Sequence, residues 1–233
     1  MMKLLSFPKV SVGNLDPRQK HSGMTRTSIK NLKVLVTCGA TWTPIDDVRV
    51  ISNVSSGQMG HLIAKAFSLK KAQVTVIEGP VAHTLDDKKI KVIKYRYFDE
   101  LAKVLKQEIS KKYDIIVHAA AVSDFKAAKV SNRKMASGKS ISLKLIPTPK
   151  LIKQIKRLSP NSFLVGFKLE SRLNQKDIFK TVRPLFKSSA CDLVVANSIK
   201  QGYKGFIVNA DGNILKYTES KEALAQDLVK LLI

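Results

Sequence analysis

Residues 34–41 have the sequence Val-Leu-Val-Thr-Cys-Gly-Ala-Thr, which opens with a short, β-branched apolar run at 34–37. Such a run is typical of a strand buried on both faces of a parallel sheet. Similar runs return at 74–77 and 115–117, and apolar residues at helical spacing lie between them at 59–69 and 98–111. Strands that alternate with helices predict a parallel sheet with right-handed crossovers.

The rest of the chain extends this pattern and adds an antiparallel edge. Asn209 to Asn213 contain Asp and Gly between two apolar runs, which predicts a hairpin turn. We therefore expect a doubly wound, mostly parallel, Rossmann-like α/β sheet with an antiparallel edge hairpin. The further expected elements are strands at 90–95, 141–145 (half exposed), 164–167 and 193–196, the hairpin at 206–217, and helices at 173–188 and 220–232.

Length and composition favour one globular domain. The 233 residues suffice for a single core, which we place at 31–233 as one domain, behind a flexible basic extension at 1–30. Cys38 and Cys191 form no Cys-x-x-Cys pair, so we expect neither a disulfide framework nor a structural zinc site. The sequence has no apolar run of ~18 residues, and without an expected disulfide framework the reducing cytoplasm is the default compartment.

The net charge is unusually positive. Forty-one Lys and Arg against 18 Asp and Glu give +23 at pH 7. This charge attracts polyanions, suits an enzyme with phosphorylated substrates, or belongs to a solvated lysine-rich surface. Charge alone does not separate these three interpretations.

Polar residues gather in the segment after the first strand. Ser55-Ser56-Gly57 precedes an expected helix, and free N–H groups, hydroxyls and the helix dipole form an anion site there. Asn53 offers an amide donor for a carbonyl oxygen, and Arg49 offers a bidentate donor for a phosphate or carboxylate. The alternative is a serine N-cap beside a salt-bridged arginine.

The segment after the expected strand at 115–117 is rich in alanine. Three alanines at 119–121 allow a flat ring or a ribose to approach the backbone, and Asp124 can accept from ribose hydroxyls. The alternative is close helix–strand packing with Asp124 as an N-cap. The lysine-rich loop from 126 to 139 either folds over a triphosphate or is a solvated loop.

Several other patterns do not support a site. Ser137-Gly138-Lys139-Ser140 resembles the end of a P-loop, but Arg133 stands where its first glycine belongs. No G-x-G-x-x-G follows the first strand, and Glu78 alone is weak evidence for a dinucleotide. The histidines show no metal-ligand spacing, so no metal ligand is assigned, and Cys38 is interpreted as a packed thiol.

Together these segments resemble the phosphopantothenate–cysteine ligase family, also called phosphopantothenoylcysteine synthetase, in its stand-alone form. Residues 44–60 carry the most specific match, and Ala119–Asp124, Gly166-Phe167 and Asp192–Asn197 follow in the family's order. The resemblance runs from about Leu32 to the C-terminus and implies no flavin.

The resemblance implies a two-step ligation in coenzyme A biosynthesis. A nucleoside triphosphate with Mg²⁺ activates the carboxylate of 4′-phosphopantothenate as an acyl-nucleotide. Cysteine then displaces the nucleoside monophosphate to give 4′-phosphopantothenoyl-cysteine. A homodimer acting on small molecules is implied, with no membrane partner, and nucleic acid is not the expected ligand.

The matched positions imply the site residues. Catalytic roles fall on Asn53, Arg49 and Lys134, and substrate contacts on Ser55, Ser56, Gly57 and Ala121. The nucleotide contacts are His118, Ala119, Ala120, Asp124, Lys134, Pro149, Lys150, Leu151, Ile152 and Phe167.

The nucleotide itself is less constrained by the motifs. Ser189 and Leu185 stand where CTP users have lysines, with Arg183 and Lys187 displaced, but the other elements keep the bacterial form. We therefore favour CTP over ATP. A nicotinamide-dependent reductase and a basic nucleic-acid-binding protein are the alternative functions.

Overall fold

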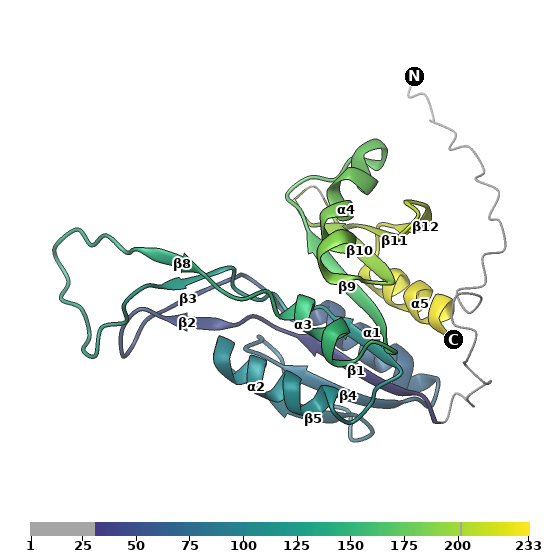
Figure 1. Cartoon of the computed structure of the whole chain (residues 1–233), viewed down its shortest axis with the longest axis horizontal. Coiled ribbons are helices and arrows are strands. Elements are labelled where there is room, and N and C mark those ends of the chain that lie inside the picture. The colour runs from purple at the N-terminus through teal and green to yellow at the C-terminus, as the bar shows by residue number, and fades with distance from the viewer. Residues whose placement is uncertain (1–30, 201) are drawn as a thin grey trace.

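An eight-stranded sheet forms the centre of the protein in the computed structural model, which describes residues 31–200 and 202–233 (Figure 1). The extension predicted at 1–30 lies outside the described residues. Six strands are parallel and β11 and β12 form the antiparallel edge, so the predicted fold class is confirmed. In spatial order the strands are β12 (Ile214–Thr218), β11 (Lys204–Asn209), β10 (Leu193–Ser198), β9 (Phe163–Leu169), β6 (Ile115–His118), β1 (Lys33–Cys38), β4 (Gln73–Glu78) and β5 (Lys91–Lys94).

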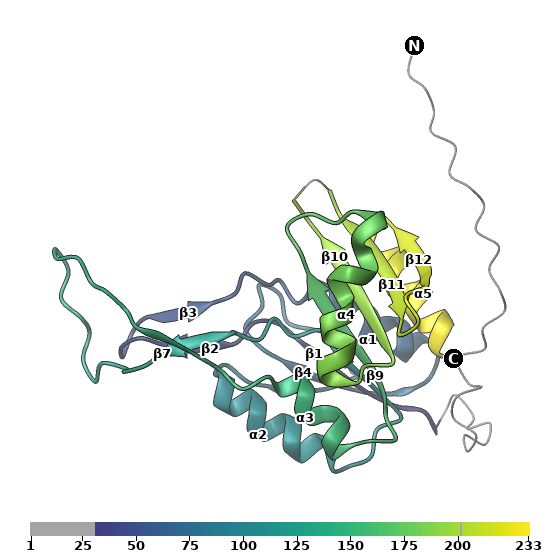
Figure 2. The same ribbon diagram turned by 45° about the horizontal axis from the view of Figure 1, so that its top comes forward.

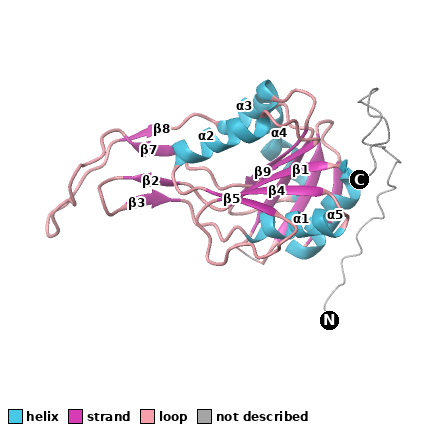
Figure 3. Ribbon diagram, turned by 90° about the horizontal axis from the view of Figure 1, so that it is seen from below, coloured by secondary structure: helices cyan, strands magenta, loops and turns pink. Residues whose placement is uncertain are grey.

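Helices cover both faces of this sheet (Figure 3). Side chains alternate along a strand, so Val34, Val36 and Cys38 of β1 face one helical layer while Leu35 faces the other. The first layer is α1 (Gln58–Leu69) and α5 (Lys221–Leu232), and the second is α2 (Phe98–Ile109), α3 (Leu151–Leu158) and α4 (Ile178–Ser189), which the short helix η3 (Gln175–Asp177) precedes. None of the helices in the described ranges is both long and apolar enough to cross a membrane.

Two small ribbons project from the carboxyl edge of the sheet as an arm (Figures 1 and 2). One pairs β2 (Trp42–Pro44) with β3 (Val50–Ser52), and the other pairs β7 (Phe125–Ala127) with β8 (Leu145–Pro147). We use "the arm" for residues 42–52 and 125–147. Both ribbons are antiparallel, and their strands are only three residues long.

The arm and α3 contain the elements that the sequence analysis misplaced or missed. The strand expected at 141–145 is wrong, because β8 begins only at Leu145 and the residues before it have no regular structure. Their apolar side chains are exposed and have no sheet face to bury. Helix α3 was missed because its eight residues are too few to establish a helical period.

The chain order creates a crevice between β1 and β6. From β1 the chain continues to β4 and β5 on one side, and it returns to β6, β9 and β10 on the other. Ligands of doubly wound sheets bind outside the carboxyl ends of the strands at this switch point. The backbone continues to pair beyond the strands, where Ala119 N donates to Thr37 O (3.1 Å) and Ala121 N to Gly39 O (2.8 Å).

Candidate functional site

A hollow of about 330 Å³ opens at the carboxyl edge beside the switch point. Its walls are Ala40 and Trp42 after β1, residues 52–55 after β3 and residues 80–82 after β4. Gly39 bends the chain into this wall with φ +79°, a conformation that favours glycine. An added Cβ there would also meet the Gly79 backbone at 2.9 Å.

Asn53 links two segments that are far apart in the sequence. Its Nδ2 donates to the carbonyl oxygens of Ala121 (3.3 Å) and Val122 (3.1 Å). The residue is exposed, so the same amide can meet a ligand in the hollow. The structure thus brings the predicted Asn53 and Ala121 into direct contact.

Three buried hydroxyl residues that the sequence analysis did not assign to the site fix the loop at 121–124. Ser123 N donates to Thr41 Oγ1 (2.8 Å), and Ser123 Oγ donates to Thr41 O (3.0 Å). Thr148 Oγ1 donates to Ser123 O at 2.5 Å. The sequence offered only one signal for these residues: Thr41 follows β1 and Ser123 follows β6, the neighbouring strand. Hydroxyl residues also follow strands in ordinary loops, so this signal was not specific.

Helix α1 begins beside the hollow, and its N-cap residue makes no side-chain capping bond. This residue is Gly57, in the left-handed region at φ 72°. Ser55 Oγ and Ser56 Oγ accept only long bonds of 3.4 Å from the N–H groups of Gly57 and Gln58. With no acidic residue in its first turn, the helix start keeps its positive end open to an anion.

The loop after β6 begins with a buried histidine, and partly exposed alanines follow it. His118 is buried with Nδ1 at 2.9 Å from Thr37 Oγ1, and burial lowers its pKa to about 4, so it is neutral. Ala119 and Ala120 are partly exposed and pack toward opposite faces of the sheet. The register sets His118 beside Gly166, which places Ala119 beside half-buried Phe167.

Asp124 and Lys150 form an exposed ion pair at the base of the arm. The alternative role of Asp124 as a helix N-cap is wrong, because β7 and not a helix follows it. Pro149 is exposed next to Lys150, whereas Leu151 is buried and Ile152 packs against the core on the α2 face. The structure therefore presents the first half of this predicted segment and buries much of the second.

Arg49 and Lys134 lie in the arm and not in the hollow. Arg49 Nε is 3.3 Å from Asp46 Oδ2, and its guanidinium donates to Met135 O. Burial would raise the pKa of Asp46, but N–H groups of Met135, Val48 and Arg49 and the Arg49 charge hold that pKa below its ordinary value. The predicted cluster is thus divided, with a salt-bridged arginine on the arm and Lys134 exposed next to Met135.

These features define a class of protein. It is a Rossmann-like α/β domain whose ligand crevice offers amides, hydroxyls and a helix N-terminus. The chain belongs to the family described as the DNA/pantothenate metabolism flavoprotein C-terminal domain, whose pattern matches residues 29–232.

Known proteins share this sequence and fold. The coenzyme A biosynthesis bifunctional protein CoaBC of Thermococcus kodakarensis is 39% identical over 176 residues, 74% of this chain and 43% of that protein. The DNA/pantothenate metabolism flavoprotein of Streptococcus pneumoniae has the same fold, with TM-score 0.77 and 24% identity over 86% of this chain and 98% of that one. The Cab2 H337A mutant in complex with phosphopantothenate-cysteine gives TM-score 0.69 and 18% identity over 87% and 86%.

The matches cover only part of the curated relatives. The chain spans about half the length of the curated relatives that it matches. The family resemblance inferred from the sequence is confirmed, and the reductase and nucleic-acid-binding alternatives are not favoured.

Proposed function

We propose that this domain joins 4′-phosphopantothenate to L-cysteine in a nucleotide-dependent ligation of coenzyme A biosynthesis. The observation that carries the proposal is the contact of Asn53 with the 121–122 carbonyls, directly beside the open start of α1. Family membership and the name of the Thermococcus relative support it. So does the phosphopantothenate-cysteine bound in the Cab2 structure.

The reaction runs in two steps on this edge. The carboxylate oxygen of phosphopantothenate attacks the α-phosphorus of the nucleotide and expels pyrophosphate. The cysteine amine then attacks the acyl carbon, the nucleoside monophosphate leaves, and the amine proton passes to solvent. Both steps depend on positioning and on charge neutralisation.

The described residues divide these tasks. Ser55, Ser56, Gly57 and the α1 N-terminus hold an anionic group of the substrate. Asn53 Nδ2 exchanges one of its two carbonyl partners for the acyl oxygen of the substrate. The base lies against Ala119, Ala120 and Phe167, whose apolar surface is partly exposed. For Asp124 to accept from the ribose, its ion pair with Lys150 opens, which is inexpensive because an exposed pair contributes at most about 1 kcal/mol.

Arg49 and Lys134 act after a movement of the arm loop at 128–144. Gly138 in this loop has φ +91° and open space around it, so the loop can bend there. We propose that closure brings Lys134 over the triphosphate, while Arg49 holds the loop through Met135. Closure would exclude water from the acyl-nucleotide.

Mg²⁺ fits this edge as a companion of the nucleotide. Magnesium keeps several waters and binds through phosphates and one or two carboxylates, so it needs no protein cage. The phosphates of the nucleotide and water would hold the ion, and no described side chain is assigned to it. The ion would supply charge neutralisation on the phosphates.

A homodimer through the arm is also part of the proposal. Large apolar side chains are exposed along the arm, and a concentrated apolar surface marks an interaction site. They are Val48, Val50, Phe125, Val130, Ile141, Leu143 and Leu145. Light scattering should give the mass of two chains, and Leu143→Glu should lower it to one while Leu69→Glu, outside the arm, should not.

The deciding experiment is pyrophosphate release with phosphopantothenate, cysteine and each nucleotide in turn. We expect release with CTP, which we favour over ATP, and none when phosphopantothenate is omitted. A folded protein that releases pyrophosphate with neither nucleotide contradicts the function. Both described cysteines are free, so we assign the reaction to the reducing cytoplasm.

A further inference from the structure

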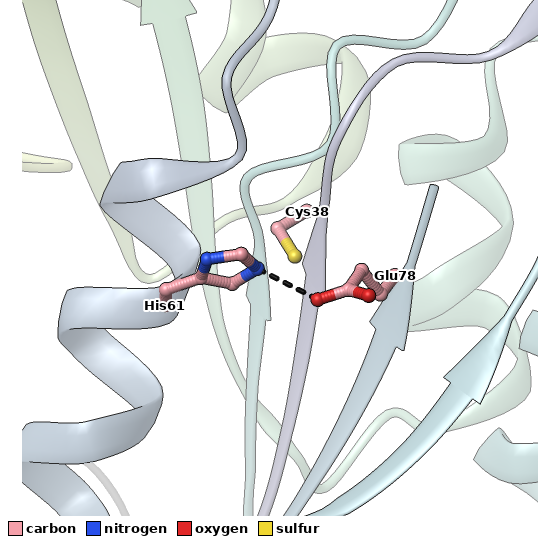
Figure 4. Close-up of side chains that lie close together, drawn as sticks. All are labelled: Cys38, His61 and Glu78. Carbon is pink, nitrogen blue, oxygen red and sulfur yellow. Dashed lines mark hydrogen bonds and ion pairs between the residues drawn. The ribbon is translucent and has the colours of Figure 1, made fainter. Parts of the chain in front are cut away.

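Three side chains without a role in the ligation meet beneath the hollow (Figure 4). Cys38 ends β1 and Glu78 ends β4, and these two residues are direct partners in the parallel register. Paired residues of neighbouring strands point to the same face, here the face that α1 covers. His61, near the start of α1, points toward this pair.

The donor atoms of these residues lie close together. Cys38 Sγ, His61 Nε2 and a Glu78 carboxylate oxygen all lie within 4.8 Å of one another. In a tetrahedral zinc site, bond lengths of about 2.0 Å to N and O and about 2.3 Å to S set the ligands about 3.3–3.5 Å apart. Side-chain rotations of about 1 Å would therefore bring the three donors to coordination distance.

Glu78 has a free coordinating atom in this cluster. The residue is 1% exposed, and its Oε1 accepts from Leu85 N (2.9 Å) and lies 2.8 Å from His61 Nε2. Its Oε2 is buried and has no hydrogen-bond partner among the described residues. A buried carboxylate oxygen without a partner is costly, and a cation would satisfy it.

We propose that Cys38, His61 and Glu78 form a binding site for Zn²⁺. One sulfur, one imidazole nitrogen and one carboxylate suit a borderline-soft transition metal, whereas Mg²⁺ and Ca²⁺ take oxygen ligands alone. Zinc replaces the thiol proton, which passes to solvent, and it replaces the bond between His61 and Glu78. Glu78 Oε2 or a water completes the coordination.

The metal would join the three elements that support the hollow. It would connect the ends of β1 and β4 with the start of α1, where Gly57 presents the open helix terminus. Zinc would stabilise this corner of the domain, and it takes no part in the ligation. Because its readout is metal binding, the test does not depend on the proposed function.

The test uses the full chain after treatment with a chelator. Zn²⁺ binding is measured by calorimetry, and Co²⁺ is used as a coloured substitute that gives a thiolate charge-transfer band. We expect about one Zn²⁺ per chain, binding at least about 100-fold weaker in Cys38→Ser, His61→Gln and Glu78→Gln, and no cobalt–thiolate band in Cys38→Ser.

Matched controls separate this site from other groups. Cys191→Ser changes the other buried thiol, and His83→Gln changes an exposed histidine, so both should bind zinc like the unaltered protein. Glu78→Gln preserves shape and serves if Cys38→Ser fails to fold. Absence of zinc binding by the unaltered chain, or undiminished binding by folded Glu78→Gln and His61→Gln variants, would overturn the proposal.

Discussion

Replacing Asn53 by aspartate should slow the ligation strongly while leaving the protein folded. The change removes an amide that donates to the carbonyl oxygens of Ala121 and Val122 at 3.3 and 3.1 Å. It puts a negative charge in the same place, beside those carbonyls and the phosphates of the substrates. Because Asn53 is exposed and water can replace the two lost bonds, the free energy of unfolding should fall by less than about 2 kcal/mol, and the protein should stay folded.

The magnitude follows from two contributions. Loss of a donor to the acyl oxygen costs about 2–3 kcal/mol of transition-state stabilisation. A unit charge at ~8 Å from a phosphate adds about 2 kcal/mol in the effective dielectric of a protein surface. Since about 1.4 kcal/mol corresponds to a tenfold change in rate, we expect a loss of about 10²-fold or more.

The assay is pyrophosphate release together with formation of the phosphopantothenoyl-cysteine product. Asn53→Ala, which loses the bonds without gaining the charge, should lie between the unaltered protein and Asn53→Asp. Asn161→Asp adds the same charge between α3 and β9, away from the carboxyl edge, and should retain full activity. If folded Asn53→Asp works within about threefold of the unaltered rate, the role assigned to Asn53 is wrong.

Three further predictions test other parts of the structure. Lys134→Gln should slow acyl-nucleotide formation by at least about tenfold, and Lys129→Gln should not; equal impairment when cysteine is given the pre-formed acyl-nucleotide would contradict the assigned role. Gly60→Ala would set a Cβ 2.4 Å from Cys38 Cβ, so denaturant unfolding should show a loss of about 1–3 kcal/mol, against about 0.5 kcal/mol or less for exposed Lys65→Ala. Burial holds the pKa of His118 at about 4, below its ordinary 6.5, so the unfolded chain takes up the proton first as the pH falls. The free energy of unfolding should therefore fall by up to about 3 kcal/mol between pH 6.5 and 4, and His118→Asn should lack this part of the fall; equal pH dependence in both proteins would count against the buried neutral histidine.

The apolar runs of the sequence determined the central sheet and most of its helices. Leu35 and Val36 belong to a β-branched run too short for a helix, and such runs recur between segments of helical period. A strand that is buried on both faces needs apolar side chains at every position, so it is visible in the sequence as a continuous apolar run. The order of strands and helices could therefore be predicted. The hairpin at residues 204–218 was predicted for a similar reason, because its turn residues are local.

The short strands at the edge of the fold could not be predicted from the sequence alone. The ribbon strands of the arm have three residues each, so alternation cannot be distinguished from chance, and their pairing joins distant segments. Arg49 shows the consequence for the site. Its nearness to Asn53 in sequence suggested one cluster, but an extended strand between them carries Arg49 onto the arm.

Only the tertiary structure decided which distant side chains meet. Cys38, His61 and Glu78 have no local spacing that suggests a metal, and strand register and helix packing bring them within 4.8 Å. The same holds for Asn53 and the carbonyls of residues 121 and 122. Residue types are local and can be read from sequence, whereas contacts across the sheet depend on strand order, because neighbours in space are set by pairing and not by distance along the chain.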